Sequence, residues 1–577
     1  MLPQRSPLNV LLILVDDLRP EILGSPALTP HIDRLAKSST VFDRAYCQQA
    51  ICGPSRNSFL SGRRPQRTQS WNFLNHFREV GPNWVSLPQW FKQHNYTALA
   101  TGKTYHPNLP PRWDQPLSWS ADRPYVFAEN GYPPCDRKDS LQNSMVCPSA
   151  HPDSWYADHS DASATIADLE YALRAKKRFF LVYGAHRPHL PWNVPQRFWE
   201  IYPPTESVSV AEHEAGPRGM PPIAFTYEVD GQPTLRSFGA AVPVPYPDAS
   251  TAPPANVSRS LRKGYYAAVS WTDHQVGRLL DALDEHAVAG ETVVALAGDH
   301  GWALGEHNIW GKHSNFEVAA RVPLILRTPG GAGRRQPGLV ELVDLYPTLA
   351  ALAGLPPPPD VDGADLSGLV LGGGGAGKEA AFSEYPRCPR RLEAPWDDLT
   401  SCTRTRKEDF RAMGYSVRTD GWRLTAWLRW DGARLVGDFS QPPVGVELYA
   451  HPAGEADSDF DATENVNVAD LHPAVVRRLM GLAEAHWGKG PGEPVEGQEP
   501  RGREQGGVAG VEQGKAADAS MARVESDAEL LRMQFEEWWA GGVSGAMRRQ
   551  WTRSTSTRPP VAPARAVLYR DRFEPPG

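Results

Sequence analysis

The sequence predicts an α/β protein, built on a large mixed but mostly parallel sheet flanked by helices, with a smaller α+β C-terminal subdomain that has an antiparallel sheet. Four continuous apolar runs are typical of strands covered on both faces: Asn9–Val15, Thr97–Thr101, Arg178–Tyr183 and Thr292–Ala297. Helical patterns lie between these runs, and such alternation indicates an α/β sheet. A later stretch alternates apolar and polar residues, as antiparallel strands do.

The helices are predicted in the gaps between these strands. Amphipathic patterns cover Pro30–Ser38, Val85–His94, Asp161–Lys176 and Ser260–His286. A shorter helix is predicted from Cys52 to Gly62, with Pro54 near its start and Gly62 just past its end. Residues Pro203–Ala255 are rich in proline and predict a long excursion from the core.

The C-terminal part reads differently. Tyr415–Arg418 and Trp422–Trp430 alternate like antiparallel strands, and Val475–His486 looks helical. From Gly488 the composition turns to Gly, Glu and Gln, which predicts a linker. We therefore expect a main domain at residues 1–395, a smaller subdomain at 396–487, and a linker and tail at 488–577.

Composition argues against nucleic acid as the main binding partner and against a membrane span. The 577 residues carry a net charge of −7, which argues weakly against nucleic acid. No apolar run reaches the length of a membrane span. Met1–Pro7 is too short and polar for a signal peptide, so we expect either a cytosolic protein or a chain without its leader.

The six cysteines give evidence on the redox state of the cellular compartment. Cys135 and Cys147 flank a short polar loop, as do Cys388 and Cys402, and both pairs favour disulfides and an oxidising compartment over buried thiols. Two N-x-[ST] sequons, at Asn95 and Asn256, are compatible with that compartment or with chance. Cys47 fits no zinc spacing and is interpreted as a buried thiol.

Polar residues follow each buried strand, and in such sheets ligands collect at the carboxyl ends of the strands. Asp16-Asp17 follows the first strand and Asp299-His300 follows the last one named above. Adjacent carboxylates repel unless a cation separates them, and three carboxylates favour Ca²⁺ or Mg²⁺ over Zn²⁺. The alternative is that one Asp caps a helix and the other is solvated.

A set of cations and histidines predicts an anion site at the same edge. An anionic ester needs positive donors around its oxygens and a proton donor for the leaving alcohol, and a helix start at Cys52 adds backbone donors. Taken alone, each of these residues would be interpreted as a solvated or a core side chain. As a set attached to strand ends, they favour an anion-binding site. The set is Arg56, Lys103, His106, His189 and Lys312. His186 is interpreted as a residue that supports its loop. His307 and His313 are interpreted either as groups that support the site residues or as surface residues. Trp302 either lines the substrate cleft or belongs to the core.

Seven segments in order resemble the type I sulfatases of the alkaline phosphatase superfamily, and within it the iduronate-2-sulfatase branch. They run from Asn9 to about Asn467 and leave the final ninety or so residues uncovered. The segments are NVLLILVDDLRP, QQAICGPSRNSFLSGRRP, TGKTYHP, HRPHLPW, GDHGWALGEHNIWGKHSNFEVAARVPLI, MGYSVRT and GVELY. The resemblance implies an alkaline phosphatase-like fold and hydrolysis of sulfate from a sulfated sugar or glycan.

The resemblance also implies roles for residues. Cys52, in a Cys-x-Pro-Ser-Arg pattern, would be oxidised to formylglycine by a formylglycine-generating enzyme, and Arg56 would steady this nucleophile. The implied ligands of one Ca²⁺ ion, with Mg²⁺ as the alternative, are Asp16, Asp17, Asp299, His300 and residue 52. Lys103, His106, His189 and Lys312 match sulfate-binding and proton-transfer positions. Both cysteine pairs fall where this branch has bridges, and the branch implies a secretory or lysosome-like compartment.

The chain departs from the family pattern at three positions. His300 stands where many sulfatases have Asn, although the iduronate branch shares it. Gly53 replaces the more usual Ala of the branch, a change that we expect to matter little. His313 replaces a Tyr beside Lys312, which weakens the inference of uronic-acid recognition.

The mechanism implied is transfer of the sulfuryl group to the hydrated aldehyde at position 52, followed by elimination of sulfate. The alternatives are a phosphomonoesterase or phosphodiesterase of the same superfamily, which usually employs Ser or Thr, and an unmatured protein that only binds sulfated glycans.

Overall fold

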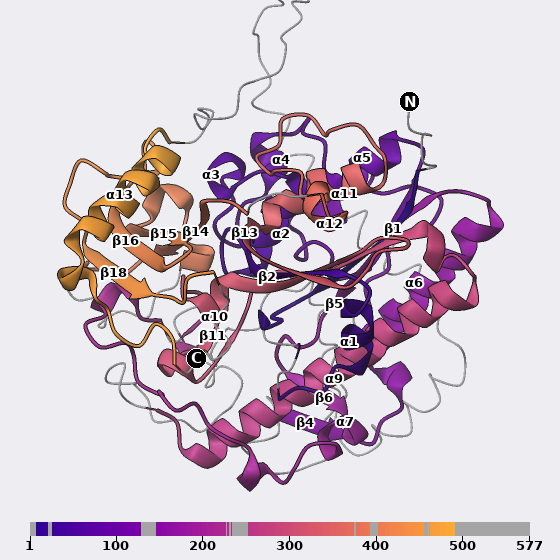
Figure 1. Cartoon of the computed structure of the whole chain (residues 1–577), viewed down its shortest axis with the longest axis horizontal. Coiled ribbons are helices and arrows are strands. Elements are labelled where there is room, and N and C mark those ends of the chain that lie inside the picture. Colours follow the sequence, from indigo (N-terminus) through magenta and orange to yellow (C-terminus); the bar gives the residue numbers. More distant parts are fainter. Residues whose placement is uncertain are drawn as a thin grey trace, which may run out of the picture. The chain divides into compact units, whose positions relative to one another are not determined.

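A computed structural model describes residues 7–20, 23, 26–128, 146–226, 228–229, 232–233, 252–373, 377–392, 402–454, 460 and 462–490. Residues up to Glu496 form one compact unit (Figure 1). The expected boundary at residue 395 stays a prediction, and the expected tail lies outside the described residues from 491 onward.

A seven-stranded mixed sheet forms the centre of this unit, in the order β13-β2-β12-β9-β1-β5-β3. β12 runs antiparallel to both its neighbours, whereas the other neighbouring pairs are parallel. The strands are β1 (Asn9–Val15), β2 (Thr40–Tyr46), β3 (Thr97–Gly102), β5 (Phe179–Ala185), β9 (Thr292–Gly298), β12 (Arg321–Arg327) and β13 (Arg334–Glu341). The mixed, mostly parallel sheet is therefore confirmed.

The four strands predicted from apolar runs, β1, β3, β5 and β9, form one continuous parallel block. The strands without a prediction are β2, β12 and β13. β13 begins with Arg334-Arg335-Gln336 at the sheet edge and is only partly buried, so it has no apolar run to detect.

Helices cover both faces of the sheet because successive β1 side chains point to opposite sides. Leu11 and Ile13 belong to the core under α1 (Pro30–Ala36), α6 (Ala157–Arg174) and α9 (Ala255–Glu285). Leu12 and Leu14 belong to the core under α2 (Cys52–Ser61), α5 (Leu87–Gln93) and α11 (Leu345–Leu352) (Figure 1). Two apolar cores thus fix the sheet from above and below.

The predicted helices are present, with shifted ends. α9 begins at Ala255, earlier than the predicted Ser260, so it takes in the end of the stretch expected to be irregular. The remaining short helices are α3 (Pro65–Thr68), α4 (Phe77–Val80), α7 (Gln196–Glu200), α10 (Glu317–Ala320) and α12 (Ser367–Val370). Small ladders join β4 (Val146–Ser149) to β6 (Trp192–Pro195), β7 (Glu228–Val229) to β8 (Gln232–Pro233), and β10 (Ala303–Leu304) to β11 (Trp310–Gly311).

The smaller C-terminal region is an antiparallel sheet with one helix, as predicted. Its strands are β14 (Ala380–Arg387), β15 (Ala412–Thr419), β16 (Trp422–Asp431), β17 (Val436–Gly437) and β18 (Gly445–Ala450). Helix α13 (Pro473–Trp487) buries Leu479, Ala483 and Trp487 against this sheet.

A buried ion-pair network joins the two sheets. Glu317 of α10 accepts from Tyr46 of β2 at 2.8 Å and from Arg418 of β15 at 3.0 Å, and it also pairs with Arg423 of β16. Arg423 Nε reaches Glu464 at 2.8 Å. Because arginines occupy these carboxylates, the cluster is a structural network, and breaking such a pair costs about 3–5 kcal/mol.

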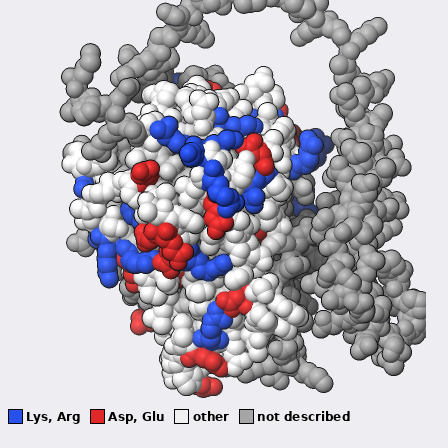
Figure 2. Space-filling model, turned by 90° about the vertical axis from the view of Figure 1, so that its right-hand side faces the viewer, with Lys and Arg blue, Asp and Glu red and all other residues white. Residues whose placement is uncertain are grey.

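On the face shown in Figure 2, basic and acidic side chains lie interspersed. Surface ion pairs of the described residues show the same mixing, such as Arg34–Asp281 at 2.6 Å and Lys177–Asp122 at 2.7 Å. Each contributes at most about 1 kcal/mol. Among the described residues, no helix is both long and apolar enough to cross a bilayer.

Candidate active site

The ends of four parallel strands meet at one edge of the sheet, as the sequence predicts. β1 ends beside both β5 and β9, because Val15 pairs with Ala185 on one side and with Gly298 on the other. Asp16-Asp17 and Asp299-His300 therefore leave neighbouring strands side by side. Lys103 follows β3, and His186 and His189 follow β5.

Cys52 lies at the first turn of α2 and is 2% exposed. Its Sγ lies 3.1 Å from Lys312 Nζ and 3.7 Å from Lys103 Nζ. Burial, together with the nearby Asp16 carboxylate, raises the pKa of the Cys52 thiol. An unmodified thiol here is therefore held in its neutral, weakly nucleophilic form.

Four side chains can hold one cation. Ligand atoms of Asp16, Cys52, Asp299 and His300 all lie within 4.8 Å of one another. Asp16 Oδ1 and His300 Nε2 are buried and make no hydrogen bond within the described residues. His300 Nδ1 lies 3.0 Å from the Gly301 carbonyl, which leaves Nε2 with its lone pair free for a metal. These orphaned atoms fit a hard divalent ion.

Asp17 stands slightly apart from that group. Its Oδ1 lies 2.6 Å from Lys312 Nζ and 3.6 Å from His300 Nδ1, while its buried Oδ2 makes no hydrogen bond within the described part of the chain. Its backbone has φ +59°, a strained region that asparagine and aspartate tolerate best. Asp17 thus offers one further oxygen to a cation.

The charges of the two adjacent aspartates differ. Burial opposes ionisation of Asp16, but Lys103 and its cationic neighbours hold the pKa of Asp16 well below its usual range. Burial raises the pKa of Asp17 to about 7, and the Asp16 charge adds to this against the pull of Lys312. In the absence of a cation, two adjacent carboxylates do not both ionise easily here.

Arg56 is fully buried and connects α2 to two strand ends. Its Nε donates to Asp299 Oδ2 at 2.8 Å, and its NH1 donates to the carbonyls of Lys103 and of Thr104, the latter at 3.1 Å. Ser55 Oγ donates to the Asp299 carbonyl at 2.5 Å. Ser55 was not among the predicted site residues, although it stands in the Cys-x-Pro-Ser-Arg segment.

Lys103 and Lys312 both lie near residue 52. Lys103 pairs with Asp16, and Lys312 pairs with Asp17. Burial lowers the pKa of each lysine, but the carboxylates more than offset this, so the pKa of both is raised and both stay charged. Gly102, with φ +64°, lets β3 end against β5, where an added Cβ would lie 2.1 Å from the Gly184 carbonyl oxygen.

Three buried histidines lie near Lys103 and Asp16 in neutral form. Burial, followed by the charge of Lys103, holds the pKa of His106, His186 and His189 well below the usual range. The Nδ1 atoms of His106 and His189 lie 3.1 and 2.7 Å from the carbonyls of Pro107 and Leu190. Their Nε2 atoms are then left as proton acceptors. Rings of His186 and His189 pack edge to face at 5.3 Å.

The other candidates discussed from the sequence are buried. The His313 ring stacks on Tyr385 at 5.7 Å, and the His307 ring stacks on Phe316 at 4.5 Å. Trp302 is 3% exposed, with Lys312 Nζ 5.6 Å from its ring. Cys47 is a fully buried thiol, as interpreted.

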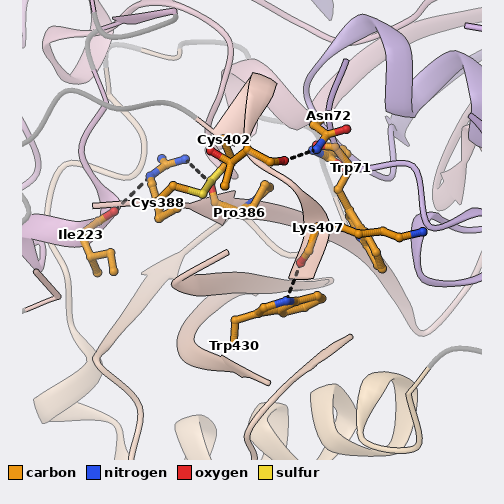
Figure 3. Close-up of a disulfide and its surroundings, with 11 residues drawn as sticks. Trp71, Asn72, Ile223, Pro386, Cys388, Cys402, Lys407 and Trp430 are labelled. Atoms are coloured by element: carbon orange, nitrogen blue, oxygen red, sulfur yellow. Dashed lines mark hydrogen bonds between the residues drawn. A yellow bond between two sulfur atoms is a disulfide. The ribbon is translucent and has the colours of Figure 1, made fainter. Parts of the chain in front are cut away.

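The Cys388–Cys402 disulfide is confirmed (Figure 3). The Cys135–Cys147 pairing lies outside the described residues, because residues 129–145 and the Cys147 side chain are not described. Asn95 and Asn256 of the two sequons are both exposed.

Comparison with known proteins agrees with this arrangement. Residues 8–355 match the family model described as Sulfatase. The chain is 35% identical to iduronate 2-sulfatase of Mus musculus over 530 residues, covering 82% of this chain and 93% of that protein. It is also 35% identical to the Homo sapiens iduronate 2-sulfatase over 500 residues, covering 77% and 88%.

Solved structures share the fold. A phosphonate monoester hydrolase from Silicibacter pomeroyi superposes with a TM-score of 0.62 at 20% identity, covering 83% of this chain and 94% of that one. A 2-O GAG sulfatase superposes with a TM-score of 0.60 at 19% identity, covering 83% and 92%.

Proposed function

Because this chain belongs to the sulfatase family, and hydrolyses sulfate esters of sulfated sugars, we propose that its substrate is a 2-O-sulfated uronic acid such as iduronate 2-sulfate. The two relatives that are 35% identical over most of the chain carry that activity in their names. The observation that supports the chemistry is the position of Cys52, at a helix start near two charged lysines and near three side chains that could hold a cation.

Residue 52 acts in this proposal as formylglycine, made from Cys52 by a formylglycine-generating enzyme. Sγ then stands in for the oxygen atoms of the hydrated aldehyde. Both lysine Nζ atoms near Sγ are placed to hold anionic sulfate oxygens. Arg56, buried against Asp299, fixes α2 and thereby residue 52.

A divalent cation, which we propose to be Ca²⁺, would be held by Asp16, Asp17, Asp299, His300 and residue 52. Oxygen-rich sites with several carboxylates suit Ca²⁺ or Mg²⁺, and the orphaned atoms of Asp16, Asp17 and His300 supply the ligands. When bound, the cation polarises sulfate and lowers the pKa of the hydroxyl at residue 52.

The chain's own groups carry the two proton transfers. One hydroxyl of residue 52 gives its proton to a carboxylate such as Asp299 as it attacks sulfur, the bond from sulfur to the sugar oxygen breaks, and the leaving alcohol takes a proton from His189, assisted by Lys312. The bound sulfate charge favours the protonated form of His189. The second hydroxyl then gives its proton to His106 Nε2, the C–O bond to sulfate breaks, and the aldehyde reforms.

The test has two parts. Peptide mass spectrometry across residue 52 of protein expressed with a maturation enzyme should find formylglycine, and the protein should hydrolyse a fluorogenic iduronide 2-sulfate. Cys52→Ala with full turnover would reject the scheme. Faster turnover of a matched phosphate ester would favour a phosphoesterase, and an intact thiol in active natural protein would reject the aldehyde.

We also propose an oxidising, secretory or lysosome-like compartment, which the Cys388–Cys402 disulfide and the two exposed sequon asparagines support. Treating the protein from its native source with a glycosidase should lower its apparent mass. No mass change and reduced cysteines would argue for the cytosol.

A further inference from the structure

Phe73 lies between the catalytic loop after β3 and the start of α2, and the proposed mechanism gives it no role. Its ring stacks on the His106 ring with centroids 4.5 Å apart and planes 19° from parallel. The same ring also lies against Gly53, the neighbour of Cys52: an added Cβ there would lie 3.2 Å from Phe73 Cδ1 and 3.3 Å from Cε1. The ring therefore lies close both to His106 and to the backbone beside the nucleophile.

The backbone of Phe73 is anchored from the smaller sheet. Its N–H donates to the Thr403 carbonyl at 2.9 Å, and Asn72 Nδ2 donates to the Thr405 carbonyl at 2.6 Å. Both carbonyls follow Cys402, so the disulfide links the start of the accepting segment to Cys388 (Figure 3). Trp71, which precedes them, donates from Nε1 to Glu384 at 2.8 Å.

The hydrogen bond made by the His106 ring itself positions that ring only weakly. Its Nδ1 bonds to the carbonyl of Pro107, the next residue along the chain. That bond moves with the loop and does not fix the ring plane relative to α2. Stacking on an aromatic face fixes that plane and contributes about 0.5–1.5 kcal/mol beyond area burial.

We propose that Phe73 is a positioning residue that holds the His106 ring toward residue 52, and that Gly53 lets the ring lie there without displacement. This rests on the proposed function, in which His106 takes the proton of the second hydroxyl as the C–O bond to sulfate breaks. Gly53, expected from the sequence to matter little, then becomes coupled to Phe73.

Loss of the Phe73 ring should affect the two halves of the reaction differently. A misplaced His106 slows release of sulfate but leaves cleavage of the sugar sulfate unchanged. The variant should therefore release a burst of one alcohol per active site and then turn over slowly. A base displaced by about 1 Å lowers the rate about 100-fold, so we expect kcat to fall about 10- to 100-fold.

The experiment compares Phe73→Leu, which keeps apolar volume without a ring, with Phe73→Tyr, which keeps the ring. Pre-steady-state release of a fluorogenic alcohol is followed for each, normalised to formylglycine content by peptide mass spectrometry. Phe73→Leu should show the burst and the low kcat, and Phe73→Tyr should restore single-phase turnover. Leu74→Ala, at a neighbouring side chain 43% exposed, is the matched control and should behave as the parent.

Gly53→Ala supplies an independent arm. It should show the same burst, because its Cβ pushes the Phe73 ring, and it should add little in the Phe73→Leu background, where the ring is gone. A parental kcat without a burst in Phe73→Leu, or equal slowing of both phases, would overturn the inference. Absence of sulfatase turnover in the parent protein would instead overturn the proposed function.

Discussion

Replacing Glu384 with glutamine tests whether the carboxyl that anchors Trp71, and through it the Phe73 segment, is neutral in the folded protein. Glu384 lies on β14, is 1% exposed, and accepts from Trp71 Nε1 at 2.8 Å. Burial raises its pKa from 4.5 to about 7, although the Trp71 bond opposes this. A glutamine oxygen can accept the same bond without any charge.

The sign of the pH effect follows from proton binding. Between about pH 4.5 and pH 7 the folded protein holds a proton on Glu384 that the unfolded chain has lost, so this carboxyl lowers stability as pH rises. Because one pH unit corresponds to about 1.4 kcal/mol, the loss reaches about 1 kcal/mol at about pH 5.5 and about 3 kcal/mol above about pH 7.5. Glu384→Gln removes this loss.

The assay is urea unfolding of the parent and the variant across that pH range. The difference in free energy of unfolding between variant and parent has two parts. The part that does not change with pH reports how well the amide fits. The part that changes with pH should grow toward about 3 kcal/mol in favour of the variant as pH rises. Glu379→Gln, at an exposed carboxyl just before β14, is the control for the same substitution outside the buried cluster. A difference for Glu384→Gln that does not change with pH would refute a neutral buried carboxyl.

Three further outcomes are expected. Lys312→Met should lower kcat about 100-fold or more, since it removes the donor 3.1 Å from Sγ; kinetics showing only a raised KM would contradict this. Glu317→Gln should lower the free energy of unfolding by about 3 kcal/mol, because it leaves Arg423 buried with a weaker partner; an unchanged unfolding midpoint would count against the network. Chelation of Cys52→Ala should lower its Tm, and Ca²⁺ at about 100 times its Kd should restore about 3 kcal/mol, whereas no shift would argue against a cation site.

The sequence predicted the parts of the fold that local pattern determines. Continuous apolar runs identified the parallel strands β1, β3, β5 and β9, because strands covered on both faces need no polar residues. The polar residues that follow these strands converge because the carboxyl ends of parallel strands lie at the same edge of the sheet. The antiparallel direction of β12 and the polar edge strand β13 depend on tertiary pairing, which leaves no such local signal.

Contacts between distant segments escaped prediction. Phe73 is an ordinary aromatic residue in the sequence, and its stacking on His106 depends on two loops meeting over α2. Gly53 was interpreted as a neutral replacement because no pattern reveals how near the Phe73 ring lies. The Glu317 network likewise joins residues about a hundred or more positions apart.

All ten residues of α2, from Cys52 to Ser61, are buried. If Cys52 is oxidised to formylglycine as proposed above, an enzyme that binds this segment as an extended peptide cannot reach it once the domain has folded. The amount of active protein then depends on whether oxidation of the nascent chain precedes its folding, and a molecule that folds first keeps its thiol. Slower folding, for example during expression in the cold, should raise the yield of competent enzyme without altering a single contact.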